Sequence, residues 1–272
     1  MKILRNKINL KKEILDIKGL AFIPTMGALH YGHVKMIKFA KNKFKKIIVS
    51  IFVNPKQFNS KHDFKSYPRN IEKDIKLLKR LKVDFLYLPS YIDIFSFKTK
   101  KKVYLHSFSK KLCGKYRKGH FEGVLNVVNR FLEIIKPRYI VLGKKDFQQL
   151  FLIKQHIQKS KIHTKVISYK TIREKNGVAL SSRNFKLNSK QIKVCSLIVN
   201  YLKKEKRKIK EKKFFFDLKD LLLKKIKKFN TVKIDYLDFL NLKTLKKPKS
   251  RKNSFNIFIA YRINNIRLID NF

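Results

Sequence analysis

FIPTMGALHYGHVKMI, residues 22–37, is the stretch that decides the fold of this chain. It opens with an apolar run that ends at Pro24, turns through Gly27 and Gly32, and continues into apolar residues at helical spacing. This order predicts a strand, a tight turn and a helix. Glycine permits backbone angles and close approaches that a side chain would block, so the turn can press against a ligand. The start of a helix presents unpaired N–H groups and a positive dipole end, which suits phosphate.

Two histidines, His30 and His33, fall at this predicted helix start. The H-x-G-H spacing brings both imidazoles to one bound anion, where their N–H groups can donate to phosphate oxygens. A simpler interpretation is two solvent-facing histidines that only cap the helix, and a four-residue pattern alone occurs by chance in many chains. The neighbouring PTMG, with a strand before it and a helix after it, favours the functional interpretation.

Strand and helix patterns alternate along the first two thirds of the chain. The predicted strands are residues 22–24, 45–53, 84–89, 139–143 and 163–169, with a helix at 71–81, a long one through 124–135 and another opened by GKKDFQQL. We therefore predict an α/β fold, a doubly wound, Rossmann-like parallel sheet, over residues 1–172.

The pattern changes after residue 184. Two helices, roughly 188–206 and 214–229, precede strands near 232–239 and 255–263. Lysine-rich residues 203–213 are predicted to be a solvated helix end and linker, and residues 246–253 an exposed loop. Residues 173–272 are thus expected to form a smaller α+β domain that acts as a lid.

Composition bounds the class of protein. The chain has 272 residues and 44% hydrophobic content, enough for a sizeable core. No apolar run approaches the roughly 18 residues of a membrane span, and the N-terminus lacks the apolar segment of a secretory signal. Cys113 and Cys195 form no motif, so free thiols in a reducing cytoplasm are expected.

The charge is strongly basic, with 68 Lys and Arg against 18 Asp and Glu and a formal net charge of +50. Such a field attracts polyanions without regard to sequence. The lysines are nevertheless spread along the whole chain, and abundant Lys, Asn, Ile, Phe and Tyr with little Gly and no Trp is typical of AT-rich coding. We interpret the charge mainly as compositional, with nucleic acid only a non-specific partner.

PTMGALHYGH resembles the ATP-binding signature of the pantoate–β-alanine ligase (pantothenate synthetase) family, within the H-x-G-H nucleotidyltransferases. Further stretches are similar to the same family: FVNPKQF at 52–58, KDFQQ at 145–149, ALSSRN at 179–184 and RLIDN at 267–271. Arg117, Gly119, His120 and Phe121 match its RxGHF segment, although Lys118 stands where a proline is common. Several motifs in the right order make a chance match very unlikely.

Polar residues follow the predicted strands. Lys145 can neutralise phosphate, and Asp146 can hold a ribose hydroxyl or hydrated Mg²⁺. Asn54 and Gln57 carry neutral amides suited to a polar substrate, or form an ordinary Asn-Pro turn. Lys144 replaces the glutamate usual in the family, which adds positive charge at the mouth of the site.

Residues 173–184, REKNGVALSSRN, are either a plain hairpin or a functional loop. In the functional interpretation, Ser181, Ser182 and Arg183 present hydroxyls and a guanidinium to departing pyrophosphate. Leu180 replaces a methionine of some family members, with similar volume.

The resemblance implies ATP-dependent condensation of D-pantoate with β-alanine through pantoyl adenylate. It implies catalytic roles for His30, His33, Lys145 and Arg183, and substrate-binding roles for Gln57, Gln149 and Asn54. The ATP-binding residues it implies are Met26, Gly27, Ala28, Leu29, His30, Tyr31, Gly32, His33, Gly143, Lys144, Lys145, Asp146, Ile172, Leu180, Ser181, Ser182 and Arg183. Mg²⁺ is an implied cofactor, its ligands unidentified by sequence, and the family is commonly homodimeric.

Two alternatives remain open at this point. Another H-x-G-H nucleotidyltransferase would move a nucleotide onto a phosphate, which FVNPKQF and KDFQQ argue against. A nucleic-acid-binding protein is favoured by charge and disfavoured by the lack of a basic, aromatic-studded motif.

Overall fold

The structure is a computed structural model that describes residues 1–211, 217–227, 229–248 and 254–272. The chain divides into two compact units, Met1–Thr171 and Ile172–Phe272. Each unit has its own sheet and its own buried apolar cluster.

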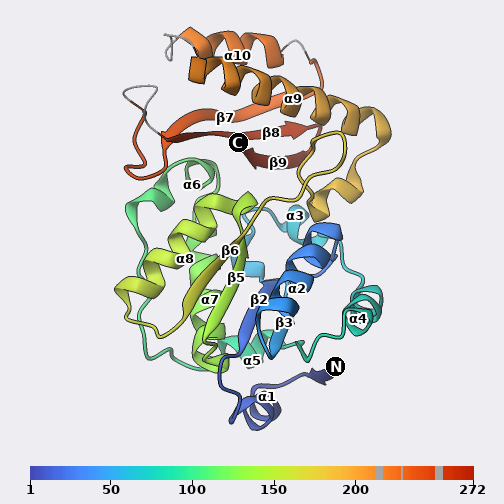
Figure 1. Ribbon diagram of the computed structural model, residues 1–272, viewed down its shortest axis with the longest axis vertical. Helices are drawn as coiled ribbons and strands as arrows, with labels where there is room; N and C mark the ends of the chain where they lie inside the picture. The colour runs from blue at the N-terminus through green and yellow to red at the C-terminus, as the bar shows by residue number, and fades with distance from the viewer. Residues whose placement is uncertain (212–216, 228, 249–253) are drawn as a thin grey trace. The chain divides into compact units, whose positions relative to one another are not determined.

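The first unit contains a six-stranded sheet in the order β1-β4-β3-β2-β5-β6, and every pair of neighbouring strands is parallel (Figure 1). The strands are β1 Lys2–Leu4, β2 Ala21–Thr25, β3 Ile47–Ile51, β4 Phe85–Tyr87, β5 Tyr139–Gly143 and β6 Lys165–Tyr169. From β2 the chain builds outward through β3 and β4, and β5 then pairs with the other side of β2. This reversal confirms the predicted doubly wound sheet.

Helices cover both faces of this sheet. They are α1 Lys7–Ile14, α2 Tyr31–Lys43, α3 Lys61–Lys65, α4 Ile71–Arg80, α5 Tyr91–Phe95, α6 Cys113–Tyr116, α7 His120–Ile135 and α8 Phe147–Lys159. Short 3-10 turns are η1 Pro55–Gln57, η2 Ser107–Lys110 and η3 Lys144–Asp146.

Alternate strand residues face opposite helix layers. Ile23 and Val49 cluster with Ile37 of α2, while Phe22 packs against Phe131 of α7 with ring centroids 5.4 Å apart. All five residues of β3 are buried, as a parallel strand covered on both faces requires. Each fully buried Ile or Val stabilises the fold by about 1.5–3 kcal/mol. The packing of the sheet between its two helix layers therefore holds the strand ends in place.

The second unit is an antiparallel sheet in the order β7-β8-β9, with α9 and α10 packed together on one side of it (Figure 1). Its elements are η4 Ser182–Lys186, α9 Ser189–Glu211, α10 Asp217–Lys227, β7 Val232–Asn241, β8 Phe255–Ile263 and β9 Ile266–Asn271. Its core joins Cys195 and Ile198 of α9 and Leu222 of α10 to Ile259 of β8.

Several boundaries differ from the sequence prediction. α9 runs to Glu211, past the expected end at 206, because its Lys- and Glu-rich last turns are good helix formers. The rest of the expected linker (212–213), the predicted helix start at 214–216 and residues 249–253 of the expected loop lie outside the described residues. β9 was not predicted as a strand; Asn264, with φ 50°, turns the chain from β8 into it. β1 and α1 were also missed.

Neither cysteine forms a disulfide, and both Cys113 and Cys195 are buried. Among the helices of the described residues, none combines the length and apolarity needed to cross a membrane.

Candidate active site

The predicted site residues of the first unit follow the carboxyl ends of β2, β3 and β5. β2 pairs with β3 on one side and with β5 on the other, so the segments that follow these three strands lie at one edge. Strand order reverses at β2, and open α/β sheets bind ligands at such a reversal. The loop before α2, the turn η1 and the turn η3 are therefore neighbours by topology.

The two histidines cap α2 reciprocally. His30 is the N-cap, and its Nδ1 accepts from the Gly32 N–H at 3.1 Å, while His33 Nδ1 accepts from the His30 N–H at 3.3 Å. A neutral imidazole has one acceptor nitrogen and one N–H, so both rings carry their proton on Nε2. The ring centroids are 4.1 Å apart. The backbone thus fixes two neighbouring Nε2–H donors.

Both imidazoles are neutral at pH 7. Burial lowers the pKa of His30 to about 4, with a further lowering by Lys145 and an opposing effect of Asp146. Burial, then His30 and then Lys145 lower the pKa of His33 to about 3. These effects also show that the structure brings the two predicted histidines together with Lys145 and Asp146.

The backbone around the histidines does not offer the free N–H groups expected from the sequence. Six N–H groups already have acceptors inside the protein, those of Gly27, Ala28, Leu29, His30, Gly32 and His33. These six amides are therefore not unpaired, in contrast to the unpaired N–H groups that the sequence led us to expect at this helix start.

Asp74 of α4 is the residue that sequence reasoning missed. Its Oδ2 and Oδ1 accept from the N–H groups of Ala28 and Leu29, both at 2.8 Å, and it is 3% exposed. Gly27 (φ 76°) and Ala28 (φ 49°) are left-handed, and a Cβ at Gly27 would lie 2.9 Å from Asp74 Oδ2. The available signal was a carboxylate four residues before Leu78, on the buried face of a helix.

Tyr31 is the first residue of α2 and is 55% exposed. The ammonium of Lys35 lies over its ring in a cation–π contact, with Nζ 5.0 Å from the ring centroid.

The turn η1 is fixed by the side chain of Asn54. Asn54 is 1% exposed; its Oδ1 accepts from the Lys56 N–H at 3.1 Å and its Nδ2 donates to Gly123 O at 3.0 Å. Its Nδ2 also approaches Gln57 Oε1 at 3.5 Å, and Gln57 Nε2 donates to Met26 Sδ. The contacts of Asn54 are those of a residue that stabilises an Asn-Pro turn. Gln57 is the residue whose side-chain amide contacts the loop after β2.

Side chains of the RxGHF segment form hydrogen bonds to the backbone of the same turn. Arg117 Nη2 donates to Gln57 O at 3.1 Å, and His120 Nδ1 donates to the same oxygen at 2.7 Å. The guanidinium Nη1 lies 3.0 Å from His120 Nε2, which must accept and so leaves the proton on Nδ1. A Cβ at Gly123 would lie 2.2 Å from Lys56 O, so only glycine allows α7 to approach this closely.

After β5 the chain presents Gly143, Lys144, Lys145 and Asp146. Gly143 has φ −77°, and a Cβ there would meet nothing within 4 Å, so neither backbone nor packing requires glycine. Lys144 is exposed, and Lys145 Nζ lies 3.2 Å from Asp146 Oδ1.

Two adjacent glutamines at the start of α8 have different surroundings. Gln148 is buried and donates to Phe108 O and Lys111 O, both at 2.7 Å, so it holds η2. Gln149, the predicted pantoate ligand, is half-buried.

The remaining predicted residues belong to the second unit. The Leu180 N–H donates to Ile172 O at 3.0 Å, and the Arg183 N–H donates to Ser181 Oγ at 3.3 Å. Ser182 is 6% exposed. Ser181 thus caps η4, a local role that the sequence did not predict.

Comparison with known proteins decides the family. The model of the family described as pantoate-beta-alanine ligase matches residues 2–272. The chain belongs to this family. Its activity is the ATP-dependent ligation of pantoate to β-alanine, as the motifs predicted.

Individual relatives agree with this assignment. Pantothenate synthetase from Clostridium botulinum is 38% identical over 256 residues, 93% of this chain and 91% of the relative. The chain is also similar to a crystal structure of pantoate-beta-alanine ligase from Francisella tularensis complexed with beta-gamma ATP and beta-alanine. That structure has 36% identity and a TM-score of 0.85, with 100% of this chain and 97% of the other covered. A pantothenate synthetase from Thermus thermophilus is 28% identical, with a TM-score of 0.93 and 100% and 99% covered.

Replacing Asp74 should destabilise the first unit. Asp74→Asn keeps one acceptor oxygen but turns an amide donor toward the Ala28 or Leu29 N–H. We expect a loss of about 1–3 kcal/mol in the free energy of unfolding, measured with urea. Glu72→Gln, on the exposed face of the same helix, is the matched control and should change it by less than about 0.5 kcal/mol. Equal effects of the two substitutions would contradict the role of Asp74.

The histidines should make stability depend on pH. Their folded-state pKa values lie below the unfolded value of 6.5, so their contribution is present above pH 6.5 and is lost as pH falls toward 4. At pH 5 the loss reaches up to about 2 kcal/mol per histidine. His30→Asn keeps a capping oxygen without titrating. Urea unfolding between pH 7 and pH 5 should therefore show a shallower fall for this variant than for the wild type; parallel curves would refute the buried, neutral state.

Proposed function

We propose that the chain ligates D-pantoate to β-alanine in two steps through pantoyl adenylate. The pantoate carboxylate attacks the α-phosphate of ATP and pyrophosphate leaves; the β-alanine amine then attacks the acyl carbon and AMP leaves. The observation that carries this proposal is the pair of neutral imidazoles, each held by the backbone with its N–H on Nε2, close to Lys145.

The first step needs donors and not a base. A carboxylate is already ionised at pH 7. Imidazoles with pKa values of about 4 and 3 lack, near pH 7, the second proton of an imidazolium that a general acid would give up. Negative charge grows on the α-phosphate oxygens, where fixed N–H dipoles stabilise it without reorganisation. We assign this role to His30 and His33. The loop from Met26 to Leu29 shapes the site, since the amides of Gly27, Ala28 and Leu29 already have acceptors.

Lys145 and Arg183 are proposed to balance phosphate charge as the bond to pyrophosphate breaks. Gly143, two residues before Lys145, leaves room for a ligand, because a Cβ there would meet no protein atom within 4 Å. Lys144, Ile172, Leu180, Ser181 and Ser182 complete the proposed nucleotide-binding set.

Asp146 is the residue that fits Mg²⁺. The described residues contain no group of three or more His, Cys, Asp or Glu side chains gathered for a metal. A single half-exposed carboxylate suffices, because Mg²⁺ commonly binds through one or two carboxylates together with substrate phosphates and water. The ion would neutralise phosphate charge. Asp146 would help to hold it and, through the contact at 3.2 Å, also orient Lys145.

Pantoate is proposed to bind Gln57 and Gln149, uncharged donors suited to its hydroxyls and carboxylate. Asn54 acts through Gln57, because its own amide is engaged by Lys56 and Gly123. Gln57 contacts Met26, which lies in the loop that carries His30. Pantoate bound to the Gln57 amide would therefore have its carboxylate close to that loop.

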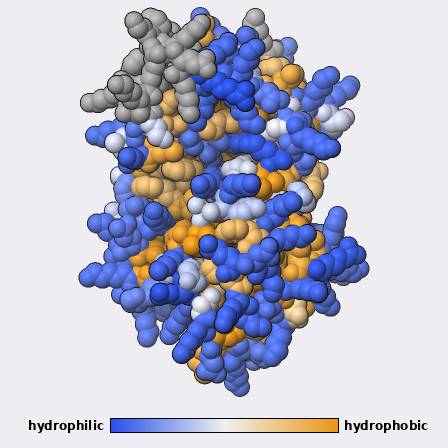
Figure 2. Space-filling model, viewed as in Figure 1, coloured by the Kyte–Doolittle hydropathy of each residue, from blue (hydrophilic) through white to orange (hydrophobic). Residues whose placement is uncertain are grey.

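The partners that we propose are small molecules and a second copy of the chain. A homodimer, checked by light scattering, rests on the family resemblance. A reducing cytoplasm is supported by two buried free thiols. Hydrophilic residues cover much of the visible face (Figure 2), and lysines are spread along the whole chain, so nucleic acid is assigned only salt-sensitive, non-specific binding. Sequence-selective DNA binding near physiological salt would contradict that.

Isotope exchange tests the two-step scheme. Pantoate alone should support exchange of labelled pyrophosphate into ATP, because the adenylate forms reversibly before β-alanine is needed. Adding β-alanine should release AMP and pantothenate. His33→Ala should slow the exchange by about 10²–10³, the effect of one lost donor to the developing charge. Exposed His163→Ala is the control and should exchange like the wild type. A folded His33→Ala enzyme with wild-type turnover would remove His33 from the chemistry.

Substitution of Gln57 should separate the two substrates. Gln57→Ala should raise KM for pantoate more than KM for ATP in the same exchange assay, since an uncharged amide suits hydroxyls better than phosphates. Lys56→Gln changes the exposed neighbour on the same turn and should leave both values unchanged. An equal rise for pantoate and ATP would count against the assignment.

A further inference from the structure

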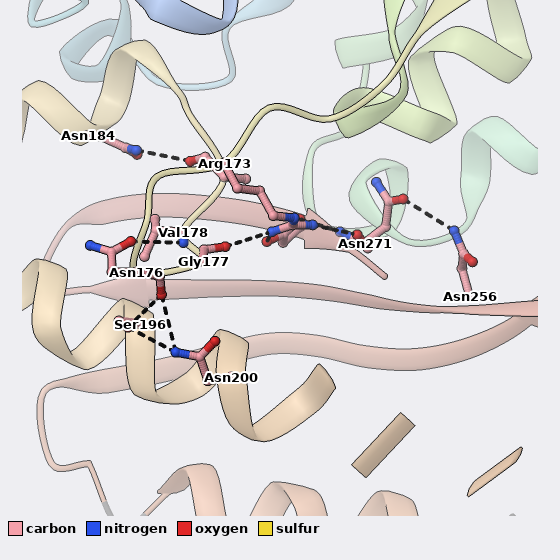
Figure 3. A network of polar contacts seen from close by, with 11 residues as sticks. Arg173, Asn176, Gly177, Val178, Asn184, Ser196, Asn200, Asn256 and Asn271 are labelled. Carbon is pink, nitrogen blue, oxygen red and sulfur yellow. Dashed lines mark hydrogen bonds and ion pairs between the residues drawn. The ribbon is translucent and has the colours of Figure 1, made fainter. Parts of the chain in front are cut away.

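RLIDN, near the end of the chain, is a signature stretch to which the proposed chemistry gives no role. Its Asp270 is 5% exposed and forms a two-bond ion pair with Arg173. Arg173 Nη1 donates to Asp270 Oδ2 at 2.6 Å and Nη2 to Oδ1 at 2.8 Å (Figure 3). Arg173 lies 97 residues earlier, at the start of the segment that leads into the Ser-Ser-Arg loop. The last strand of the chain is therefore tied to that segment.

Arg173 also fixes the hairpin to which it belongs. Its Nη1 donates to Gly177 O at 3.2 Å and its Nη2 to Asn271 O at 3.0 Å, so one guanidinium joins the hairpin turn to β9. The hairpin is closed by the Glu174 N–H donating to Val178 O at 2.9 Å. Four hydrogen bonds from one planar group fix its position far better than a single flexible ammonium would.

The opposite side of the hairpin is held by α9. Asn176 O accepts from Ser196 Oγ at 2.7 Å and from Asn200 Nδ2 at 3.2 Å (Figure 3). Gly177 has φ 89°, and a Cβ there would lie 2.9 Å from Asn200 Oδ1. The Asn-Gly pair thus serves a close approach to α9 as well as a turn.

The residues that follow the hairpin, 179–184, are held in place by their contacts with it. Ala179 forms a bridge with Arg173, and its carbonyl accepts from Asn184 Nδ2 at 3.0 Å, so the two ends of the Leu180–Arg183 segment are tied together. β9 and η4 also lie in contact. The path of the segment is set by Arg173 and Asp270, neither of which belongs to it.

We propose that Arg173 and Asp270 are positioning residues that set the approach of Arg183 to the anionic groups of ATP. This inference rests on the proposed role of Arg183. The ion pair acts only through the loop, so its loss should impair the nucleotide step and leave pantoate recognition by Gln57 unchanged.

Asp235 provides a matched control within the same unit. Its carboxylate has 6% side-chain exposure and accepts from Arg262 Nε at 3.1 Å and Arg267 Nε at 2.6 Å. Both Asp→Asn changes remove one buried, arginine-paired charge, which costs stability in either case. Only Asp270 joins the hairpin that precedes Arg183.

The experiment compares pyrophosphate exchange in Asp270→Asn, Arg173→Lys and Asp235→Asn enzymes that remain folded by circular dichroism. We expect kcat/KM for ATP to fall by about 10- to 100-fold in the first two, the scale of a displaced catalytic group, with KM for pantoate within twofold of the wild type. Asp235→Asn should retain both values within twofold. Hydrogen exchange by mass spectrometry should show faster exchange over residues 173–184 in Asp270→Asn than in Asp235→Asn.

A double-mutant cycle with Arg183→Ala shows whether the effect passes through Arg183. If it does, Asp270→Asn should cost little more once Arg183 is absent, whereas additive losses would overturn the inference. Wild-type exchange by Asp270→Asn, or equal losses in Asp270→Asn and Asp235→Asn, would also overturn it. Wild-type exchange by Arg183→Ala would instead refute the proposed function of Arg183, and with it this inference.

Discussion

The carboxylate of Asp74 holds the backbone on which the site of the first unit depends. It accepts from two successive amides, Ala28 and Leu29, where the chain has left-handed backbone angles and could not hold this path by local preference alone. Two buried bonds to a charged acceptor, each about 1.5–3 kcal/mol, offset that strain and the cost of burying the carboxylate. The position of α2, and thus of both histidines, follows from this constraint.

Saturating these amides changes what kind of anion site the loop can form. In a glycine-rich phosphate loop the backbone N–H groups bind the ligand, but here they bind Asp74, Thr25 and the histidines themselves. The backbone therefore fixes the side chains, and in the proposed site it is these side chains that would contact the anion. Because the imidazoles are neutral, the proposed mechanism leaves the balancing of ligand charge to lysine and arginine and assigns directed dipoles to the histidines.

The sequence predicted what periodicity and order determine. The strand-turn-helix at residues 22–37, the parallel sheet and the family follow from local patterns and motifs, and the structure and comparisons confirm them. It did not predict features that need a distant partner. The contacts of Asp74 with Ala28 and Leu29, 46 and 45 residues away, are invisible to local patterns, as is the pairing of Arg173 with Asp270. β9 was missed because its six residues are held as a strand by pairing with β8, a contact that the local sequence pattern does not show.

The acidic residues also bear on the meaning of the +50 charge. Only 18 of 272 residues are Asp or Glu, yet several are buried or half-buried and engaged by backbone, lysine or arginine: Asp74, Asp84, Asp235 and Asp270. Replacing such a carboxylate would leave unpaired amides or an unpaired arginine in the interior, whereas an added surface lysine costs little. A bias toward lysine codons would therefore change the surface and spare these positions. That distribution, together with lysines spread along the whole chain, is what compositional drift produces, and a dedicated polyanion-binding surface would instead concentrate the basic residues.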